Sequence, residues 1–407
     1  MIRLIKHIIK LALIFALIMC WGISLGYANN IESKEKLINF YFENNDFNIE
    51  SVKLIEESKK DLPLVGWREE SLQVATNPDL NRTANELSVL LINGSSNLLV
   101  KGSMLFKDDK EGCLIDSETS FKLFGRKNSL GKTIVYGDRN LVVRGILKGS
   151  KANIMLQLAE DSSLELDGLT IDGTEFSLNK INEFKLQFGI EEMAINVGVY
   201  YMLAKTIAMI FPILALILIL TKIVVSAFKS RNKPILLGIY IIMSIASIFI
   251  VFKATKIQIS IPLDVIPNKW SDFDFWSKMR EDYTDKIQYV MYMKKSGIDI
   301  YNIENLLKSV LFSILTIVLF VINLKVIKIS NIKELLINNV ISIICTFIAV
   351  LYIWSKFNFD VNITMLWLIY PLYLCADYFM KIHDKYLIYD EEIEIDNDED
   401  LEDEAFC

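Results

Sequence analysis

Six long apolar stretches are the feature that most constrains what this chain can fold into. A helix needs about 20 mostly apolar residues to cross a bilayer, because the hydrocarbon core offers no water to its backbone N–H and C=O groups. Hydrophobic residues make up 52% of the sequence, which is high for a water-soluble chain. We therefore predict an α-helical membrane protein with about six spans, at residues 8–28, 204–227, 235–252, 309–326, 335–354 and 363–380.

Basic residues beside the spans predict their orientation, because cytoplasmic loops carry an excess of Lys and Arg. Arg3, Lys6 and Lys10 precede the first span and place the N-terminus in the cytoplasm. Two loops are then cytoplasmic, and both are basic: Lys229, Arg231 and Lys233 follow span two, and Lys325, Lys328 and Lys333 follow span four. We expect a multi-pass protein of the cytoplasmic (plasma) membrane with residues 29–196 outside the cytoplasm.

The spans divide the chain into consecutive parts. These are an N-terminal membrane anchor (1–28), an extracytoplasmic core domain (29–196), spans two and three (197–254), an extracytoplasmic aromatic loop (255–305), spans four to six (306–381) and an acidic cytoplasmic tail (382–407). The first part has a second interpretation as a cleaved signal peptide, since the small residues Gly26 and Ala28 precede Asn29. Its apolar run is longer than the usual core of a signal peptide, which favours a retained anchor.

Residues 29–196 are predicted to fold as an α+β domain, large enough to bury its own core. Apolar residues spaced three and four apart predict helices over 34–42 and 46–59. After Trp67 the pattern changes to short β-rich segments separated by turn residues, among them Asn93-Gly94 and Gly137-Asp138. The predicted strands are 88–91, 98–100, 133–136, 141–147 and 164–171.

The loop 255–305 mixes aromatic and charged residues. Pro262 and Pro267 predict an extended start, Trp270 and Trp276 flank a cluster of aromatic residues, and a helix is predicted over 277–295. One interpretation is a platform for a substrate or partner. The other, which the position beside a span favours, is a structural collar that packs on the large domain or on lipid headgroups.

The residue types that most catalytic and metal sites require are scarce. His7 and His383 are the two histidines, so a histidine-based catalytic or metal site is not expected. Cys113 is the single cysteine of the extracytoplasmic region, which therefore has no internal disulfide. We expect a protein that is not an enzyme, with no catalytic, cofactor-binding or metal residues and no bound cofactor.

Two segments resemble ligand-binding loops and are better explained in other ways. The stretch from Gly125 to Thr133 resembles a P-loop, but five residues separate its glycines, whereas a P-loop has four. The alternative is a helix over 117–124 that begins at an Asp116 or Ser117 cap and closes at a left-handed Gly125, followed by a turn at Gly131.

The second segment, 396–400, resembles the start of an EF-hand but is followed by Leu401 where the loop needs glycine. A solvated acidic tail explains it better. The rest of the chain has no basic patch interleaved with aromatic residues, so nucleic-acid binding is not expected.

Charged residues inside predicted spans are Lys205, Lys222 and Asp377. Such residues are often functional. Here all three lie near span ends, where long side chains reach the interface. Pro212 is predicted to kink span two.

Several short motifs between residues 67 and 147 follow one another in a characteristic order. They are Gly102-Ser103-Met104-Leu105-Phe106, Gly112-Cys113-Leu114-Ile115-Asp116, Ser120-Phe121-Lys122-Leu123-Phe124-Gly125, Gly131-Lys132-Thr133-Ile134 and Val143-Arg144-Gly145-Ile146. In this order the region resembles the MacB-like periplasmic core domain of MacB-type ABC transporter permeases. The layout of a cytoplasmic N-terminus, one span, an outer domain and further spans is also similar to that family.

The resemblance implies a permease-like transmembrane subunit of an ABC-type export or transmembrane-signalling system, which couples its spans to an extracytoplasmic domain. The implied partners are the lipid bilayer, a separate ATP-binding subunit, and other copies or subunits in a homo- or hetero-oligomer. Family permeases have three spans after the domain, whereas five are predicted here. This departure keeps open the alternative of a non-transporting membrane sensor or interaction protein that retains the core domain.

Overall fold

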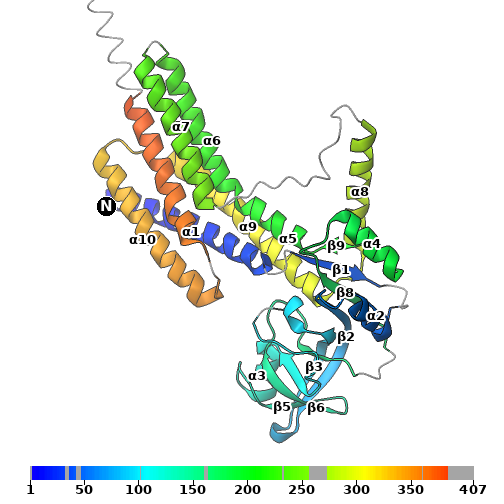
Figure 1. Ribbon diagram of the computed structural model, residues 1–407. Coiled ribbons are helices and arrows are strands. Elements are labelled where there is room, and N and C mark those ends of the chain that lie inside the picture. The colour runs from blue at the N-terminus through cyan, green and yellow to red at the C-terminus, as the bar shows by residue number, and fades with distance from the viewer. Residues whose placement is uncertain are drawn as a thin grey trace, which may run out of the picture. The chain divides into compact units, whose positions relative to one another are not determined.

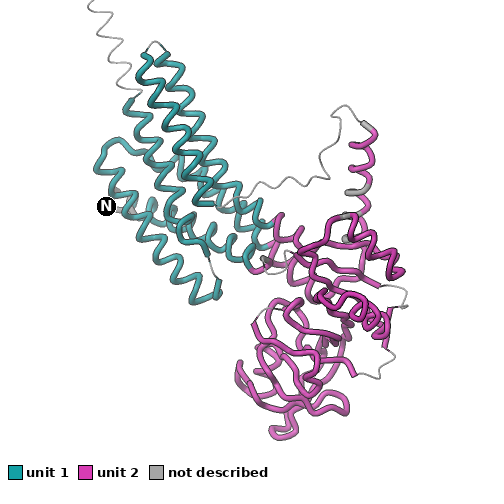
Figure 2. The backbone as a smooth tube through the Cα atoms, viewed as in Figure 1, with its two compact units in different colours: residues 1–29, 204–260, 308–407 teal, residues 30–203, 261–307 magenta. Residues whose placement is uncertain are grey.

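The computed structural model describes residues 2–32, 36–42, 47–100, 102–159, 164–231, 233–255, 273–359 and 361–383. The chain forms two compact units, which Figure 2 distinguishes by colour. Unit 1 comprises residues 1–29, 204–260 and 308–407, and unit 2 comprises residues 30–203 and 261–307.

Six helices within the described residues are long and apolar enough to cross a membrane. They are α1 (Ile2–Glu32), α5 (Gly198–Ala208) continued by α6 (Ile210–Lys229), α7 (Pro234–Thr255), α9 (Gly297–Val326), α10 (Ile332–Phe357) and the helix Ile363–His383 (Figure 1). Each coincides with one of the predicted spans, so the predicted number of spans is confirmed.

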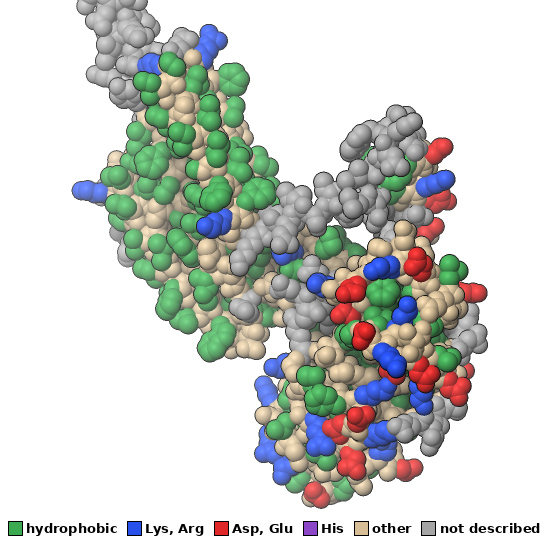
Figure 3. Space-filling view, in the orientation of Figure 1, with side chains coloured by type: hydrophobic (Ala, Val, Ile, Leu, Met, Phe, Trp, Pro, Cys, Tyr) green, Lys and Arg blue, Asp and Glu red, His purple; other side chains and the backbone are tan. Residues whose placement is uncertain are grey.

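The surface of unit 1 is apolar. Figure 3 shows hydrophobic side chains covering its visible face, whereas acidic and basic side chains gather on unit 2. Helix α7 is typical, since Ile241 and Ile242 are more than half exposed. Side chains of this kind on the outside of a helix bundle suit contact with lipid tails.

Span two contains the predicted break. The helix divides at Met209, three residues before Pro212, into α5 and α6. Proline has no N–H to donate and its ring crowds the preceding turn, which explains a division at this point.

Unit 2 is built on a nine-stranded sheet in the order β3-β7-β4-β6-β5-β2-β8-β1-β9. Because β3 also pairs with β2, six of these strands form a closed ring. The strands are β1 (Leu37–Tyr41), β2 (Leu64–Asn77), β3 (Arg82–Gly94), β4 (Gly112–Ile115), β5 (Thr133–Tyr136), β6 (Arg139–Ile146), β7 (Ile154–Gln157), β8 (Gly168–Asp172) and β9 (Ile195–Asn196).

Strand β2 belongs to both parts of this sheet. Its first residues, Leu64 to Trp67, pair with β8, whereas Ala75 and Thr76 pair with β5 in the ring. Between them the register shifts, and Leu72 adopts a positive φ of 59°. Bulges of this kind bend a strand, so one chain segment can serve both the ring and the flanking strands.

Helices α2 (Ile49–Ser58), α3 (Ser117–Phe124) and α4 (Leu178–Phe188) pack on the sheet and complete an α+β fold. Unit 2 also contains the longer helix α8 (Phe273–Tyr292) and the 3-10 turns η1 (Pro78–Leu80) and η2 (Ser96–Leu98). One apolar cluster includes Phe40, Val52 and Leu123, and a second includes Val65 and Leu90. The predicted fold class, about six spans with an α+β domain, is thus confirmed.

Two local predictions are wrong. Residues 34–42 were expected to form a helix, but Leu37–Tyr41 is strand β1, which is buried along its whole length and pairs with β8 and β9. Residues 98–100 were expected to form a strand, but Ser96–Leu98 is a 3-10 turn. In both segments tertiary contacts override a short local pattern.

The other predicted elements of this domain are found. Helix α2 lies within 46–59 and begins after Asn48, whose side chain accepts a hydrogen bond from the Ser51 N–H. The predicted strands 88–91, 133–136, 141–147 and 164–171 correspond to β3, β5, β6 and β8. Pro262, Pro267, Trp270 and the acidic segment 396–400 lie outside the described residues.

Candidate functional site

The start of helix α9 is fixed by hydrogen bonds within its own first turn. Ser296 precedes the helix, and its Oγ accepts a hydrogen bond from the Asp299 N–H at 3.2 Å. In return, Asp299 Oδ2 accepts from the Ser296 N–H at 3.0 Å and from the Ser296 hydroxyl at 2.7 Å. This reciprocal pattern is a capping box, which satisfies N–H groups that the start of a helix leaves without intrahelical partners.

Strand β2 contributes a second carboxylate to the same helix start. The Gly297 N–H donates to Glu69 Oε2 at 2.6 Å, and the Ser88 hydroxyl donates to Glu69 Oε1 at 2.5 Å. The Lys151 N–H donates to the Gly297 carbonyl at 2.9 Å. A Cβ at position 297 would lie 2.9 Å from the Ala152 nitrogen, so a glycine allows this close approach.

A chain of buried hydrogen bonds joins Asp299 to the sheet. Tyr41 Oη on β1 donates to Asp299 Oδ1 at 2.7 Å, and Asn39 Nδ2 donates to Tyr41 Oη at 2.9 Å. The Thr170 hydroxyl on β8 donates to Asn39 Oδ1 at 2.9 Å, and Trp67 Nε1 on β2 donates to Thr170 Oγ1 at 3.0 Å. Three neighbouring strands therefore supply one network that ends on the helix.

Burial makes this network costly to disturb. Asp299 is 0% exposed and Tyr41 is 4% exposed. Burial, followed by the charge of Asp299, raises the pKa of Tyr41 well above its ordinary value. Tyr41 therefore keeps its proton and remains a donor to Asp299 at physiological pH. Removal of either partner would leave a buried polar group without this hydrogen bond.

Apolar packing adds to the polar contacts. Met293 and Ile298 belong to the same buried cluster as Val65 and Leu90 of the sheet. The segment around the start of α9 is thus part of the core of unit 2. This arrangement agrees with the interpretation of the aromatic loop as a collar on the α+β domain, for the residues of that loop that the structure describes.

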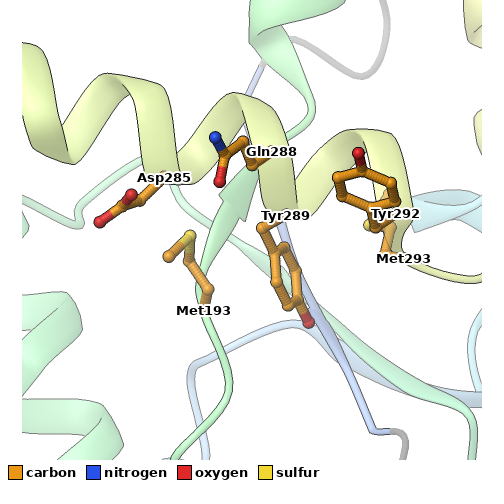
Figure 4. A pocket seen from close by; sticks show the side chains of 6 residues that line it. All are labelled: Met193, Asp285, Gln288, Tyr289, Tyr292 and Met293. Carbon is orange, nitrogen blue, oxygen red and sulfur yellow. The ribbon is translucent and has the colours of Figure 1, made fainter.

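A shallow hollow lies between the end of α8 and the segment before β9. It has a volume of about 480 Å³ and is lined by Met193, Asp285, Gln288, Tyr289, Tyr292 and Met293 (Figure 4). The Tyr289 hydroxyl reaches the backbone carbonyl of Tyr41 at 3.5 Å. The hollow is therefore adjacent to the strand that contacts Asp299.

Farther along α9, within unit 1, several buried residues are polar. The Ser24 hydroxyl of α1 lies 2.7 Å from the Ser313 hydroxyl, and the Ser309 hydroxyl donates to the Ser24 carbonyl at 3.0 Å. Asn323 Nδ2 donates to the Leu13 carbonyl at 3.4 Å. Polar side chains often join helices in this way inside a membrane, so α1 is an integral part of the helix bundle.

Two of the charged residues noted in the spans come together. Lys222 on α6 and Asp377 on the helix Ile363–His383 form an ion pair. Lys205 lies separately, on α5. The pairing could not be predicted from the sequence, because the two partners belong to different spans.

The P-loop-like segment has the alternative structure. Helix α3 begins after Asp116, whose carboxylate accepts a hydrogen bond from the Thr119 N–H at 3.0 Å, and ends at Gly125 with a φ of 71°. Gly131 has a φ of 73°, and its N–H donates to the Val143 carbonyl. The two glycines therefore belong to separate turns, as predicted.

No group of three or more His, Cys, Asp or Glu side chains able to hold a metal ion occurs within the described residues. The interactions that do stand out are those of Tyr41, Glu69 and Asp299, which the sequence did not single out. One signal could have identified them. Ser296 and Asp299 form a Ser-x-x-Asp pattern immediately before an apolar run, which is typical of a capped helix start.

Comparison with known proteins finds no matching family model and no matching curated protein. The solved structures that are similar to part of the chain include the following two. The periplasmic region of MacB from Actinobacillus actinomycetemcomitans is 14% identical with a TM-score of 0.34, covering 42% of this chain and 93% of that one. The extracellular domain of the noncanonic ABC-type transporter YknZ from Gram-positive bacteria is 16% identical with a TM-score of 0.30, covering 39% and 97%.

Proposed function

We propose that this chain is a permease-like transmembrane subunit of an ABC-type export or signalling system. In this role it transmits conformational change between its spans and its α+β domain and performs no chemistry of its own. The domain would lie outside the cytoplasmic membrane, as the basic loops predict. A separate ATP-binding subunit would supply the energy.

The observation that carries this proposal is the bond between Tyr41 and Asp299. Helix α9 runs without interruption from Gly297 to Val326 and is one of the candidate spans. Its residues up to 307 belong to unit 2, and those from 308 belong to unit 1. A movement of α9 along its axis would act on strand β1 through Tyr41 and on strand β2 through Glu69.

The first test concerns the partner. The full chain, purified in mild detergent from its native membrane, should retain an ATP-binding subunit, and ATP hydrolysis by the complex should depend on this chain. Consistent absence of any ATPase would favour the alternative, a membrane sensor or interaction protein.

The second test concerns the coupling itself. Tyr41→Phe removes the hydroxyl that binds Asp299, and Tyr136→Phe is a matched control whose hydroxyl donates to Glu70 at 2.9 Å within β2 and β5. We expect Tyr41→Phe to uncouple ATP hydrolysis from the transported or signalled output while the complex stays assembled. Equal effects of the two variants would argue against a special role for the start of α9.

A further inference from the structure

Three charged side chains meet inside unit 1, between α6 and the helix Ile363–His383. Asp377 Oδ1 accepts from the Lys222 ammonium, and Asp377 Oδ2 accepts from the Lys381 ammonium at 2.6 Å. The Lys222 ammonium also donates to Tyr373 Oη at 3.1 Å. We call Lys222, Asp377 and Lys381 the lysine–aspartate group.

The lysine–aspartate group buries its anion and exposes its cations. The side chain of Asp377 is 8% exposed, whereas those of Lys222 and Lys381 are 33% and 49% exposed. One carboxylate balances one ammonium, so the group carries a net charge of about +1 at neutral pH. The excess positive charge faces the surroundings of the helices.

Acidic side chains are scarce among the described residues of unit 1. Within the described residues of unit 1, Glu334 and Asp377 are the acidic residues, and lysines and arginines outnumber them several-fold. Glu334 Oε2 accepts a hydrogen bond from the Ser330 N–H, at the start of α10. A positive charge at a spanning helix is stabilised by an anion, and the anion that a membrane offers at helix ends is lipid phosphate.

The geometry suits such a ligand. Lys381 lies two residues, or about 3 Å along the axis, before His383, the last described residue of its helix. Lysine stems extend along apolar surface toward the interface. An ammonium has three N–H donors, so both lysines retain donors beyond the bonds described above.

We propose that Lys222 and Lys381 form a binding site for the phosphate of an anionic membrane lipid. By the predicted orientation the site faces the cytoplasmic leaflet. This proposal is independent of the function proposed above. Inorganic phosphate and the acidic segment 384–407, which follows His383 in the sequence, are the competing anions.

Native mass spectrometry of the full chain, released from phosphatidylcholine nanodiscs with added phosphatidylglycerol, tests the site. Lys381→Gln makes the lysine–aspartate group neutral and leaves the Lys222–Asp377 pair intact. We expect retention of phosphatidylglycerol to fall about fivefold, because the lipid phosphate loses one hydrogen bond from an ammonium group. Lys381→Arg should restore retention, and Asp377→Asn should increase it.

The control removes an equal charge elsewhere. Lys328 is exposed and lies on the same predicted side of the membrane, so Lys328→Gln should leave retention unchanged. An equal fall in both glutamine variants, or equal retention of the two lipids by the unaltered chain, would overturn the proposal.

Two further experiments distinguish lipid phosphate from the competing anions. Inorganic phosphate at millimolar concentration should not displace phosphatidylglycerol. Displacement of the lipid by inorganic phosphate would assign the site to free phosphate and overturn the proposal. Asn and Gln substitutions of the acidic residues in 384–407 should leave retention unchanged. Binding that emerges only in this neutralised variant would show that the acidic segment occupies the site, and would overturn the proposal.

Discussion

Trp21 Nε1 on α1 donates a hydrogen bond to the Ala208 carbonyl at the end of α5, over 3.1 Å. In an unbroken helix that carbonyl would accept from the N–H of residue 212, but Pro212 has none. Trp21 is 1% exposed, so water cannot replace the missing donor. One span therefore satisfies the backbone group that the break in another span releases.

This relationship predicts the effect of Trp21→Phe. A smaller phenyl ring replaces the indole, and the Ala208 carbonyl loses its donor in an apolar environment, which by itself should destabilise the protein by about 1–3 kcal/mol. Thermal unfolding in detergent measures the loss. In a Pro212→Ala background the alanine N–H can serve the carbonyl, so Trp21→Phe should then cost much less. Equal costs in both backgrounds would disprove this explanation.

Retention of α1 is the second prediction. Gly22 and Gly26 pack closely in unit 1, since a Cβ at Gly22 would lie 2.6 Å from Ile353 Cδ1 and one at Gly26 would collide with the Phe359 ring. Cleavage after Ala28 would remove this whole interface. A tag placed at the N-terminus should therefore remain on the mature protein in immunoblots. A mature protein that lacks the tag would restore the signal-peptide interpretation.

Sidedness is the third prediction. Residues 29–196 and 255–305 should both be outside the cytoplasm. Val290→Cys, in a chain whose other cysteines are replaced, should react with an impermeant maleimide in intact cells. Labelling that occurs only after the membrane is permeabilised would invert the topology.

The turn at Gly125 gives the fourth prediction. Gly125→Ala and Gly131→Ala each place a Cβ at a positive φ, which should cost about 1 kcal/mol of stability. A Cβ at Gly125 also meets the Arg82 guanidinium at 2.8 Å, whereas one at Gly131 meets no atom within 4 Å. The exposed Arg82 side chain can move aside, so we expect similar effects of the two substitutions in thermal unfolding of the full chain.

A substitution at Lys132, in the same segment, distinguishes a structural turn from a nucleotide-binding site. Lys132 is exposed, so Lys132→Ala should leave stability almost unchanged. A P-loop would require the opposite result, in which Lys132→Ala abolishes ATP binding while the fold stays intact. A titration with ATP decides between them.

Cys113 provides a fifth prediction, about reactivity. Burial, and to a lesser extent the charge of Asp109, raises the pKa of its thiol to about 12. Because the thiolate is the reactive form, Cys113 should resist iodoacetamide at pH 8 in the folded protein and react after denaturation. Rapid labelling of the native protein, in a variant that retains Cys113 alone, would contradict the buried position in β4.

The sequence alone determined the features that depend on local composition. The length of the apolar stretches located the six spans. A membrane helix must pair its backbone N–H and C=O groups within its own segment of about 20 residues, because lipid tails offer no partners. Pro212 located the break in span two for a similarly local reason. The helix between Asp116 and Gly125 was predictable because a side-chain cap and a left-handed glycine act within one turn.

Only the tertiary structure decided which distant residues meet. Residues 37–41 became a strand because β8, more than a hundred residues away, supplies its hydrogen bonds. Tyr41 and Asp299 are ordinary residues in the sequence, and each acquires its role from the other. Lys222 and Asp377 were noted as charged residues in the spans, but only the fold shows that they pair. Burial removes water from such pairs, so the loss of either partner leaves a polar group without a hydrogen bond at a high cost in stability. Burial is a property of the whole fold and not of any local sequence pattern.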